Sequence, residues 1–202
     1  MSTAGMRMTA PPELTELIGE PVDRVDTPAA LIDLDLFEDN AARIHRYLKR
    51  HGKTWRPHAK AHKAPFLAHL QLAIGAIGVT CAKVGEAEVM VANCVPDVLI
   101  ANQPGTPGKW ARVAILQRDA NVIACVDDAT HVNWAAEAAR ASNVTIPLFI
   151  EVDIGMRRAG VTSEQAAIEL AEQIATTDGV RLAGLMGYEG HLPSVQPRKE
   201  KV

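Results

Sequence analysis

The segment 56–63 places a lysine between two histidines, each two residues away from it. It reads Arg-Pro-His-Ala-Lys-Ala-His-Lys. Because side chains alternate along a β-strand, His58, Lys60 and His62 would lie on one side of a strand that runs through this segment. Lysine is rarely buried unless it is paired or has a chemical role, and a free amine at a strand end can form a Schiff base with an aldehyde. A basic cluster on the surface is the alternative interpretation.

A second group of charged residues ends a later predicted strand, in the segment 151–160. It reads Glu-Val-Asp-Ile-Gly-Met-Arg-Arg-Ala-Gly. Glu151 and Asp153 alternate onto one face, and two inward-facing carboxylates need partners because an unpaired buried charge is costly. Arg157 or Arg158 leaves the strand end and could supply one. A network of ion pairs with a purely structural role would explain the same residues.

A third candidate site follows the last predicted strand, in the sequence Gly-Tyr-Glu-Gly-His at 187–191. Glu189 and His191 would share a face if the strand extended that far. His191 is then a candidate catalytic residue. A hydrogen-bonded histidine at the rim of the fold is the alternative.

The composition is that of an ordinary globular protein, and it argues against several classes. The chain has 202 residues, a formal net charge of −3 and 48% hydrophobic residues, with only 4% aromatic residues. This length allows a sizeable core, and abundant small aliphatic residues suit helices packed on buried parallel strands. The mild acidity argues against a nucleic-acid partner. No apolar run approaches the roughly 20 residues that a membrane span needs.

The N-terminus and the cysteines both favour a cytoplasmic location. Residues 1–9 contain no apolar stretch, so no secretory signal is expected. Cys81, Cys94 and Cys125 are odd in number, and none has a C-x-x-C partner. Reduced thiols explain this pattern better than disulfides, and the cysteines are not expected to bind metal or act in redox chemistry.

Strands and helices alternate after a first segment, 1–26, that proline and glycine interrupt. Strands are predicted at 30–34, 54–60, 78–83, 97–102, 121–126, 147–153 and 182–188. Asp35 is the predicted cap of the first helix, with Glu38 as its capping-box partner. Further helices are predicted at 65–74, 85–93, 109–118, 129–141 and 163–176. Apolar strands alternating with helices indicate right-handed βαβ units and a parallel sheet.

These units fit a (β/α)8 barrel of the TIM type better than an open doubly wound sheet. No G-x-G-x-x-G loop is present, whereas polar residues stand at the ends of many strands, as on the carboxyl rim of a barrel. A closed barrel needs eight strands and about 250 residues. Only about six strands follow the first one. Residues 27–202 are therefore predicted to form an incomplete barrel, preceded by a loose N-terminal segment.

Three motifs together resemble the family of D-threonine aldolases and eukaryotic-type D-serine dehydratases, which belong to the alanine-racemase-like barrels. The segment 56–63 resembles the lysine motif of that family, 27–35 resembles its opening strand, and 153–160 resembles its D-x-G-x-x-R-x-G segment. The resemblance covers residues 27–191. The lysine motif is specific for the aldolase and dehydratase branch, whereas the other motifs are specific only for the superfamily.

The resemblance implies pyridoxal 5′-phosphate (PLP) as the cofactor and assigns roles to four residues. Lys60 would hold the cofactor covalently, and Arg158 would contact the cofactor or the substrate. His191 would stack beside the pyridine ring, and Tyr188 falls where the aldolase branch has an active-site tyrosine. All four are expected to bind the cofactor, and Lys60, Arg158 and His191 are also the expected catalytic residues.

The activity implied by the resemblance is that of a lyase acting on a small D-3-hydroxy amino acid. Both an aldolase and a dehydratase of D-serine or 3-hydroxyaspartate would use PLP as an electron sink, with a divalent metal, zinc or manganese, as a Lewis acid. Glu189 stands where aldolases tend to have a histidine, which favours the dehydratase. The resemblance also implies a homodimer for a full-length protein.

The length of the chain departs from the family pattern. The family has phosphate-binding loops after its last barrel strands and a C-terminal β domain that supplies the metal ligands, and this sequence contains neither region. No metal ligand is therefore assigned, and the 202 residues are expected to be an inactive fragment. A racemase-like enzyme and a non-catalytic PLP-binding protein are the alternatives.

Overall fold

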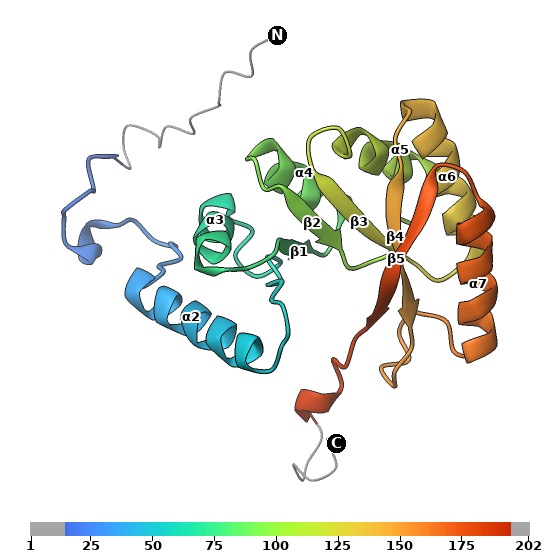
Figure 1. Ribbon diagram of the computed structural model, residues 1–202. Coiled ribbons are helices and arrows are strands. Elements are labelled where there is room, and N and C mark those ends of the chain that lie inside the picture. The colour runs from blue at the N-terminus through green and yellow to red at the C-terminus, as the bar shows by residue number, and fades with distance from the viewer. Residues whose placement is uncertain (1–14, 195–202) are drawn as a thin grey trace.

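The computed structural model describes residues 15–194, which contain a five-stranded parallel sheet (Figure 1). The strands are β1 (Val79–Cys81), β2 (Asp97–Ile100), β3 (Asn121–Val126), β4 (Ile146–Val152) and β5 (Val180–Gly187). Each strand pairs in parallel with the next one in the sequence. All carboxyl ends therefore lie at one edge of the sheet, where residues far apart in the sequence can meet.

Helices precede and connect these strands. They are α2 (Leu34–Arg50), α3 (Pro65–Ile74), α4 (Val84–Ala92), α5 (Pro107–Leu116), α6 (Ala129–Ser142) and α7 (Glu164–Thr176), with 3-10 turns η1 (Val22–Arg24) and η2 (Leu192–Ser194). Side-chain oxygens of Thr106, Asp128 and Ser163 accept backbone N–H groups at the starts of α5, α6 and α7. Such caps stabilise a helix by about 1 kcal/mol each. They therefore help to fix the residue at which each helix begins after the preceding loop.

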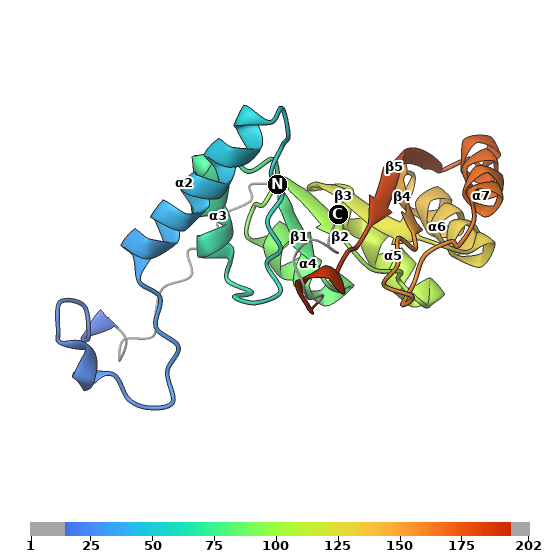
Figure 2. The ribbon, with the colours of Figure 1, turned by 90° about the horizontal axis from the view of Figure 1, so that it is seen from below.

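The two faces of the sheet are covered very differently. Helices α4 to α7 lie on one face (Figure 2), where a large cluster buries side chains such as Met90 and Trp110. The other face carries only a small cluster built on Leu99, Ile123 and Cys125. In a closed barrel this inner face would be filled from all sides. The described strands thus form an open shell with helices on its outside.

Two strands predicted near the start of the chain do not form, and these predictions were wrong. The segment 54–60 forms only an isolated parallel bridge between His58 and Thr80, with three backbone hydrogen bonds to residues 77–80 beside β1. The segment 30–34 is not a strand, and Leu31 and Ile32 are 64% and 48% exposed. A strand needs a neighbour for its backbone hydrogen bonds, and the described residues pair none with 30–34.

The start of the first long helix also differs from the prediction. Asp33, not Asp35, is the cap of α2, and its Oδ1 accepts the backbone N–H of Leu36 at 3.0 Å. Asp35 lies in the first turn, where a negative charge suits the helix dipole. Because no strand occupies 30–34, the helix can begin earlier than the pattern indicated.

The α/β class and the parallel order predicted from the sequence are confirmed, and residues 15–194 form five strands where about six were predicted. The predicted boundary at residue 26 remains a prediction. The segment 1–9, in which no secretory signal was expected, lies outside the described residues. Within residues 15–194 no helix is long and apolar enough to cross a membrane.

Polar groups at the amino-terminal edge of the sheet satisfy one another. The Arg56 guanidinium donates to the Asp97 carboxylate, which also accepts from Asn121 Nδ2 at 2.7 Å. The Arg56 and Asp97 side chains are 16% and 24% exposed. A Cβ at Gly78 would lie 2.6 Å from the Asp97 carbonyl oxygen, so the close approach needs glycine. This group ties the segment that carries Lys60 to the sheet.

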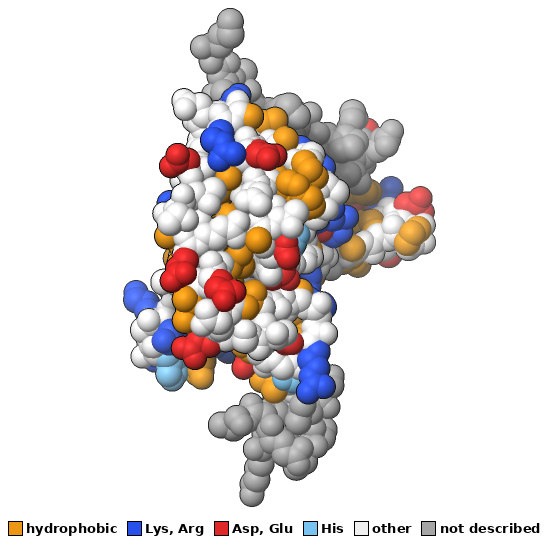
Figure 3. Space-filling view, turned by 90° about the vertical axis from the view of Figure 1, so that its right-hand side faces the viewer, with side chains coloured by type: hydrophobic (Ala, Val, Ile, Leu, Met, Phe, Trp, Pro, Cys, Tyr) orange, Lys and Arg blue, Asp and Glu red, His pale blue; other side chains and the backbone are white. Residues whose placement is uncertain are grey.

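The side of the molecule formed by α7 is a solvated surface (Figure 3). Glu164, Glu169 and Glu172 are exposed there, and Ile168 is 45% exposed. The acidic side chains lie on the outward face of α7, while Leu170 and Ile174 are buried on its other face, as in an amphipathic helix.

Candidate functional site

A hollow of about 90 Å³ opens at the carboxyl edge of the sheet. It is lined by His58, Lys60, Ala82, Ala101, Asn102, Arg158, Met186 and Tyr188. Arg158 lies in the loop after β4, and Tyr188 directly follows β5. Parallel strands bring these residues together because each leaves the same edge of the sheet. Lys60, Arg158 and Tyr188, three of the four predicted site residues, therefore surround one hollow.

One aromatic ring contacts both cations of the hollow. The centroid of the Tyr188 ring is 5.9 Å from Lys60 Nζ and 4.8 Å from Arg158 Cζ. Cation–π contacts of this kind are worth about 0.5–1 kcal/mol at exposed sites. Among the described residues, Lys60 Nζ makes no hydrogen bond or ion pair besides this contact. No carboxylate or other acceptor of the described residues therefore engages this amine.

The two histidines do not flank Lys60 in the way that a strand would place them. The chain turns directly after His58, so the prediction of one shared face was wrong. His58 lines the hollow, and burial together with the Lys60 charge lowers its pKa. His62 lies outside the lining, and its Nδ1 accepts the Ala64 N–H at 3.0 Å. Burial also lowers the pKa of His62, so both imidazoles are favoured in the neutral form.

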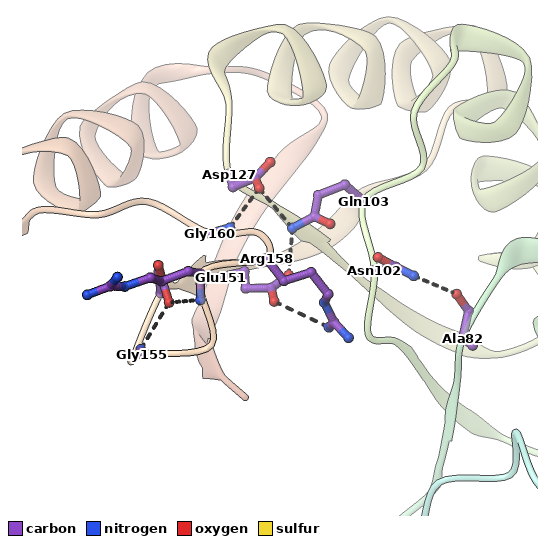
Figure 4. A network of polar contacts seen from close by, with 10 residues as sticks. Ala82, Asn102, Gln103, Asp127, Glu151, Gly155, Arg158 and Gly160 are labelled. Atoms are coloured by element: carbon purple, nitrogen blue, oxygen red, sulfur yellow. Dashed lines mark hydrogen bonds and ion pairs between the residues drawn. The ribbon is translucent and has the colours of Figure 1, made fainter. Parts of the chain in front are cut away.

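Glu151 is the buried carboxylate of this edge, with only 3% of its surface exposed. Its Oε2 accepts from Gln103 Nε2 at 2.6 Å, and its Oε1 lies 3.9 Å from Arg158 Nη2 (Figure 4). Burial raises the pKa of Glu151, and the Gln103 hydrogen bond and the Arg158 charge oppose that rise. Arg158, one of the two expected candidates, is thus the charged partner of Glu151.

A glutamine joins two neighbouring strand ends at the same place. Gln103 Nε2 also donates to Asp127 Oδ2 at 3.1 Å, and that oxygen accepts the Gly160 N–H at 2.9 Å. His131 Nδ1 lies 3.2 Å from Asp127 Oδ1, near enough for an ion pair when protonated but not aligned as a hydrogen bond. The sequence assigned no role to Gln103. Its place directly after a strand was the only available signal.

The loop after β4 is shaped by Asp153, which does not share the buried setting of Glu151. Asp153 Oδ1 accepts the backbone N–H groups of Arg157 at 2.9 Å and Gly155 at 3.0 Å, and these two bonds lower its pKa. Gly160 has a φ of +100°, and a Cβ there would lie 2.7 Å from the Asp153 nitrogen. The turn therefore depends on glycine and on a carboxylate that binds the loop backbone.

His191 lies near this loop and is not among the residues that line the hollow. Strand β5 ends at Gly187, so Glu189 and His191 do not continue it on one face. The imidazole packs against Gly155, where a Cβ would come within 3.1 Å of Nε2. His191 Nδ1 is buried and has no hydrogen-bond partner among the described residues. Stacking of His191 on a cofactor ring stays a prediction.

The residues present fit one side of a site for a carbonyl cofactor with an aromatic ring and anionic groups. Lys60 supplies a nucleophilic amine, Arg158 a fixed positive charge, and Met186 an apolar surface. The hollow of about 90 Å³ is smaller than the roughly 300 Å³ of common ligand pockets, so these residues form one wall. Within residues 15–194 no group of three or more side chains could hold a metal ion.

A parallel α/β shell with polar side chains gathered at the carboxyl ends of its strands is the arrangement of a barrel protein, whose site lies on that rim. The chain belongs to the family described as alanine racemase, N-terminal domain, whose model matches residues 32–201. This match confirms the predicted fold class, an incomplete TIM-type barrel of the alanine-racemase kind.

Individual relatives include both kinds of lyase. The D-threonine aldolase of Arthrobacter sp. is 39% identical over 183 residues, which are 91% of this chain and 48% of the relative. The D-threo-3-hydroxyaspartate dehydratase of Delftia sp. (strain HT23) is 30% identical over 167 residues, 82% of this chain and 44% of the relative. The crystal structure of D-threonine aldolase from Filomicrobium marinum superposes with a TM-score of 0.85 at 41% identity, covering 88% of this chain and 48% of that one. The chain spans about half the length of the curated relatives it matches.

Proposed function

We propose that this chain is part of a PLP-dependent lyase that acts on D-3-hydroxy amino acids, of the D-threonine aldolase or the D-serine/3-hydroxyaspartate dehydratase type. The Lys60 amine carries the proposal, because it lies unpaired in a hollow that it shares with Arg158 and Tyr188. The lysine motif and the similarity to PLP-dependent aldolases and dehydratases support it.

When bound, PLP withdraws electrons from the substrate Cα and so weakens the bonds to that atom. Lys60 Nζ would hold the cofactor through its aldehyde carbon, and the same amine would serve as the base for the proton at the substrate Cα. Arg158 would hold the phenolic oxygen or the substrate carboxylate, since a fixed positive charge favours an anion. Tyr188 would contact both cations through its ring.

We further propose a cytoplasmic location, which the free thiols of Cys81, Cys94 and Cys125 support. A small D-amino acid is the proposed substrate. A homodimer of the whole protein stays a prediction from the family resemblance.

Covalent trapping of PLP tests the proposed site directly. The chain is incubated with PLP, reduced with borohydride and mapped by peptide mass spectrometry. We expect the label on Lys60, and none on Lys63, whose Nζ is paired with Glu86 at 3.3 Å. Lys60→Ala should lose the label and Lys63→Ala should keep it. A label on Lys63 or Lys53 with none on Lys60 would overturn the assignment.

The reaction type is tested on the whole protein that contains this chain. D-threonine should yield glycine and acetaldehyde from an aldolase, whereas D-3-hydroxyaspartate should yield a 2-oxo acid and ammonia from a dehydratase. L-threonine is the control. Turnover of none of the D-substrates by a protein that carries PLP on Lys60 would contradict the lyase proposal and leave the cofactor site standing.

A further inference from the structure

The side-chain amide nitrogen of Gln103 donates hydrogen bonds to two carboxylates at the carboxyl edge of the sheet. Gln103 Nε2 donates to Glu151 Oε2 at 2.6 Å and to Asp127 Oδ2 at 3.1 Å (Figure 4). Gln103 leaves β2, Asp127 leaves β3, and Glu151 belongs to β4. This nitrogen therefore links the ends of three successive strands, and both of its protons have an acceptor.

We infer that Gln103 is a positioning residue, which keeps the Glu151 carboxylate oriented and charged so that it holds the Arg158 guanidinium at the hollow. The inference rests on the proposed function, because Arg158 is the group that would contact the cofactor or the substrate. Gln103 itself is not among the residues that line the hollow.

The contact between Glu151 and Arg158 depends on charge. Arg158 Nη2 lies 3.9 Å from Glu151 Oε1, longer than the roughly 2.7–2.9 Å of a charge-assisted hydrogen bond. The Arg158 side chain is 49% exposed, while that of Glu151 is 4% exposed. Arg158 also contacts the Tyr188 ring, but its attraction to Glu151 is Coulombic, and that attraction vanishes when the carboxylate takes up a proton.

The surroundings of Glu151 otherwise oppose its charge. Burial and the neighbouring Asp127 and Asp153 carboxylates favour the protonated acid, and they raise its pKa. The buried Cys125 thiol faces the same region, and burial with the nearby carboxylates keeps it protonated. Only Arg158 and the Gln103 N–H favour the anion. Removing the Gln103 donor would therefore shift Glu151 toward the protonated acid and weaken its attraction for Arg158.

The loop that carries Gln103 is itself fixed to the sheet. Asn102 Nδ2 donates to the Ala82 carbonyl at 3.2 Å, just beyond β1, and Pro104 is buried. The donor of Gln103 is thus presented from an anchored loop. This anchoring suits a residue that orients other groups, because the nitrogen cannot follow either carboxylate away from the site.

A Gln103→Met variant tests the inference, because methionine has a similar volume and no donor. Gln173→Met is the matched control: Gln173 is also half-buried, and its amide donates to Asn133 Oδ1 at 3.1 Å and Ala129 O at 3.3 Å, between α6 and α7. Three quantities are measured for each chain: the melting temperature without PLP, the Kd for PLP from absorbance, and the fraction of Lys60 labelled after borohydride.

We expect Gln103→Met to weaken PLP binding about tenfold near neutral pH, the usual consequence of losing a hydrogen bond to a charged group. The ratio of variant to wild-type Kd should shrink as the pH rises, because Glu151 then ionises without help. Gln173→Met should lower the melting temperature by a similar amount and leave the Kd unchanged. If Gln103→Met does not fold, Gln103→Asn, whose shorter side chain reaches less far, should give a smaller effect with the same pH trend.

A double-mutant cycle separates positioning from general loss of structure. In a Glu151→Gln background, which has no charge to protect, Gln103→Met should change the Kd for PLP by less than about twofold. A full tenfold effect in that background, or a defect independent of pH, would overturn the inference. A wild-type chain that takes no label on Lys60 would instead reject the proposed function, and this inference with it.

Discussion

The amino-terminal and carboxyl edges of the parallel sheet both carry arginine and acidic residues, but these residues have different roles at the two edges. At the amino-terminal edge, Arg56 donates to Asp97, which is also bonded to Asn121, and both members of the pair are mostly buried. At the carboxyl edge, Arg158 is 49% exposed and 3.9 Å from its carboxylate, and Lys60 Nζ makes no hydrogen bond or ion pair among the described residues. Arg56 and Asp97 thus form a structural ion pair at the amino-terminal edge, whereas Arg158 and Lys60 remain accessible at the carboxyl edge.

The difference follows from what each edge must do. A satisfied, buried pair resists change because breaking it strands a charge away from water. A site that binds a ligand needs groups whose hydrogen-bonding capacity is still unused, as at the carboxyl rim of barrel enzymes. The comparison therefore predicts that substitutions at the amino-terminal edge change stability, while those at the carboxyl edge change binding.

The largest expected effect on stability is that of Arg56→Met. It leaves Asp97 without its charged partner and should lower the free energy of unfolding by about 2–3 kcal/mol, allowing for partial exposure of the pair. Urea denaturation measures this loss. The exposed Arg118→Met is the control and should stay within about 0.5 kcal/mol of wild type. If the folded Arg56→Met protein also lost affinity for PLP, the two edges would not be independent.

Arg158→Ala should act in the opposite way. The Kd for PLP, or the turnover of the whole enzyme, should worsen at least about tenfold, because one charge-assisted contact contributes roughly 1.5–3 kcal/mol. The free energy of unfolding should hardly change, since the side chain is half-exposed. Arg157→Ala is the control, because Arg157 does not line the hollow and its backbone N–H, which binds Asp153, is kept in the variant. A larger effect of Arg157→Ala would show that Arg157, not Arg158, is the arginine that contacts the cofactor or the substrate.

Glu151→Gln should stabilise the fold while it weakens binding. The pKa of Glu151 is raised in the folded state, chiefly by burial, so the folded state holds this proton more tightly than the unfolded chain. Its contribution to stability therefore falls as the pH rises above the ordinary carboxyl value of 4.5. The variant should be more stable than wild type by about 1 kcal/mol at pH 8 and by less at pH 5. Melting temperatures at both pH values measure this; an equal difference at both would contradict it.

His191→Phe should have the smallest effect. Its ring packs against Gly155 outside the lining of the hollow, so PLP binding should change by less than about twofold. The absorption band of bound PLP should shift if the imidazole stacks on the cofactor. Loss of binding would show that His191 does more than pack. If the His191 imidazole lay more than about 10 Å from Lys60 Nζ in a PLP complex, the prediction that the two residues share a site would be wrong.

Much of the fold could be predicted from local patterns. The alternation of apolar strands with helices located β1 to β5 and α3 to α7 to within a few residues, and it indicated the parallel sheet. These patterns work because side-chain periodicity and helix caps act over only a few neighbouring residues. The motif around Lys60 also identified the hollow, together with Arg158 and Tyr188.

The tertiary structure alone decided the remaining features. Whether 30–34 becomes a strand depends on a neighbouring strand. The chain turns at 59–62, directly after the bridge at His58, and His62 is not among the residues that line the hollow. Gln103 became important only because β2, β3 and β4 bring Asp127 and Glu151 to the same nitrogen. Contacts of this kind depend on the register of strands that lie more than twenty residues apart in the sequence. No local pattern of residues contains that information, because the positions of such groups are set by how the sheet assembles.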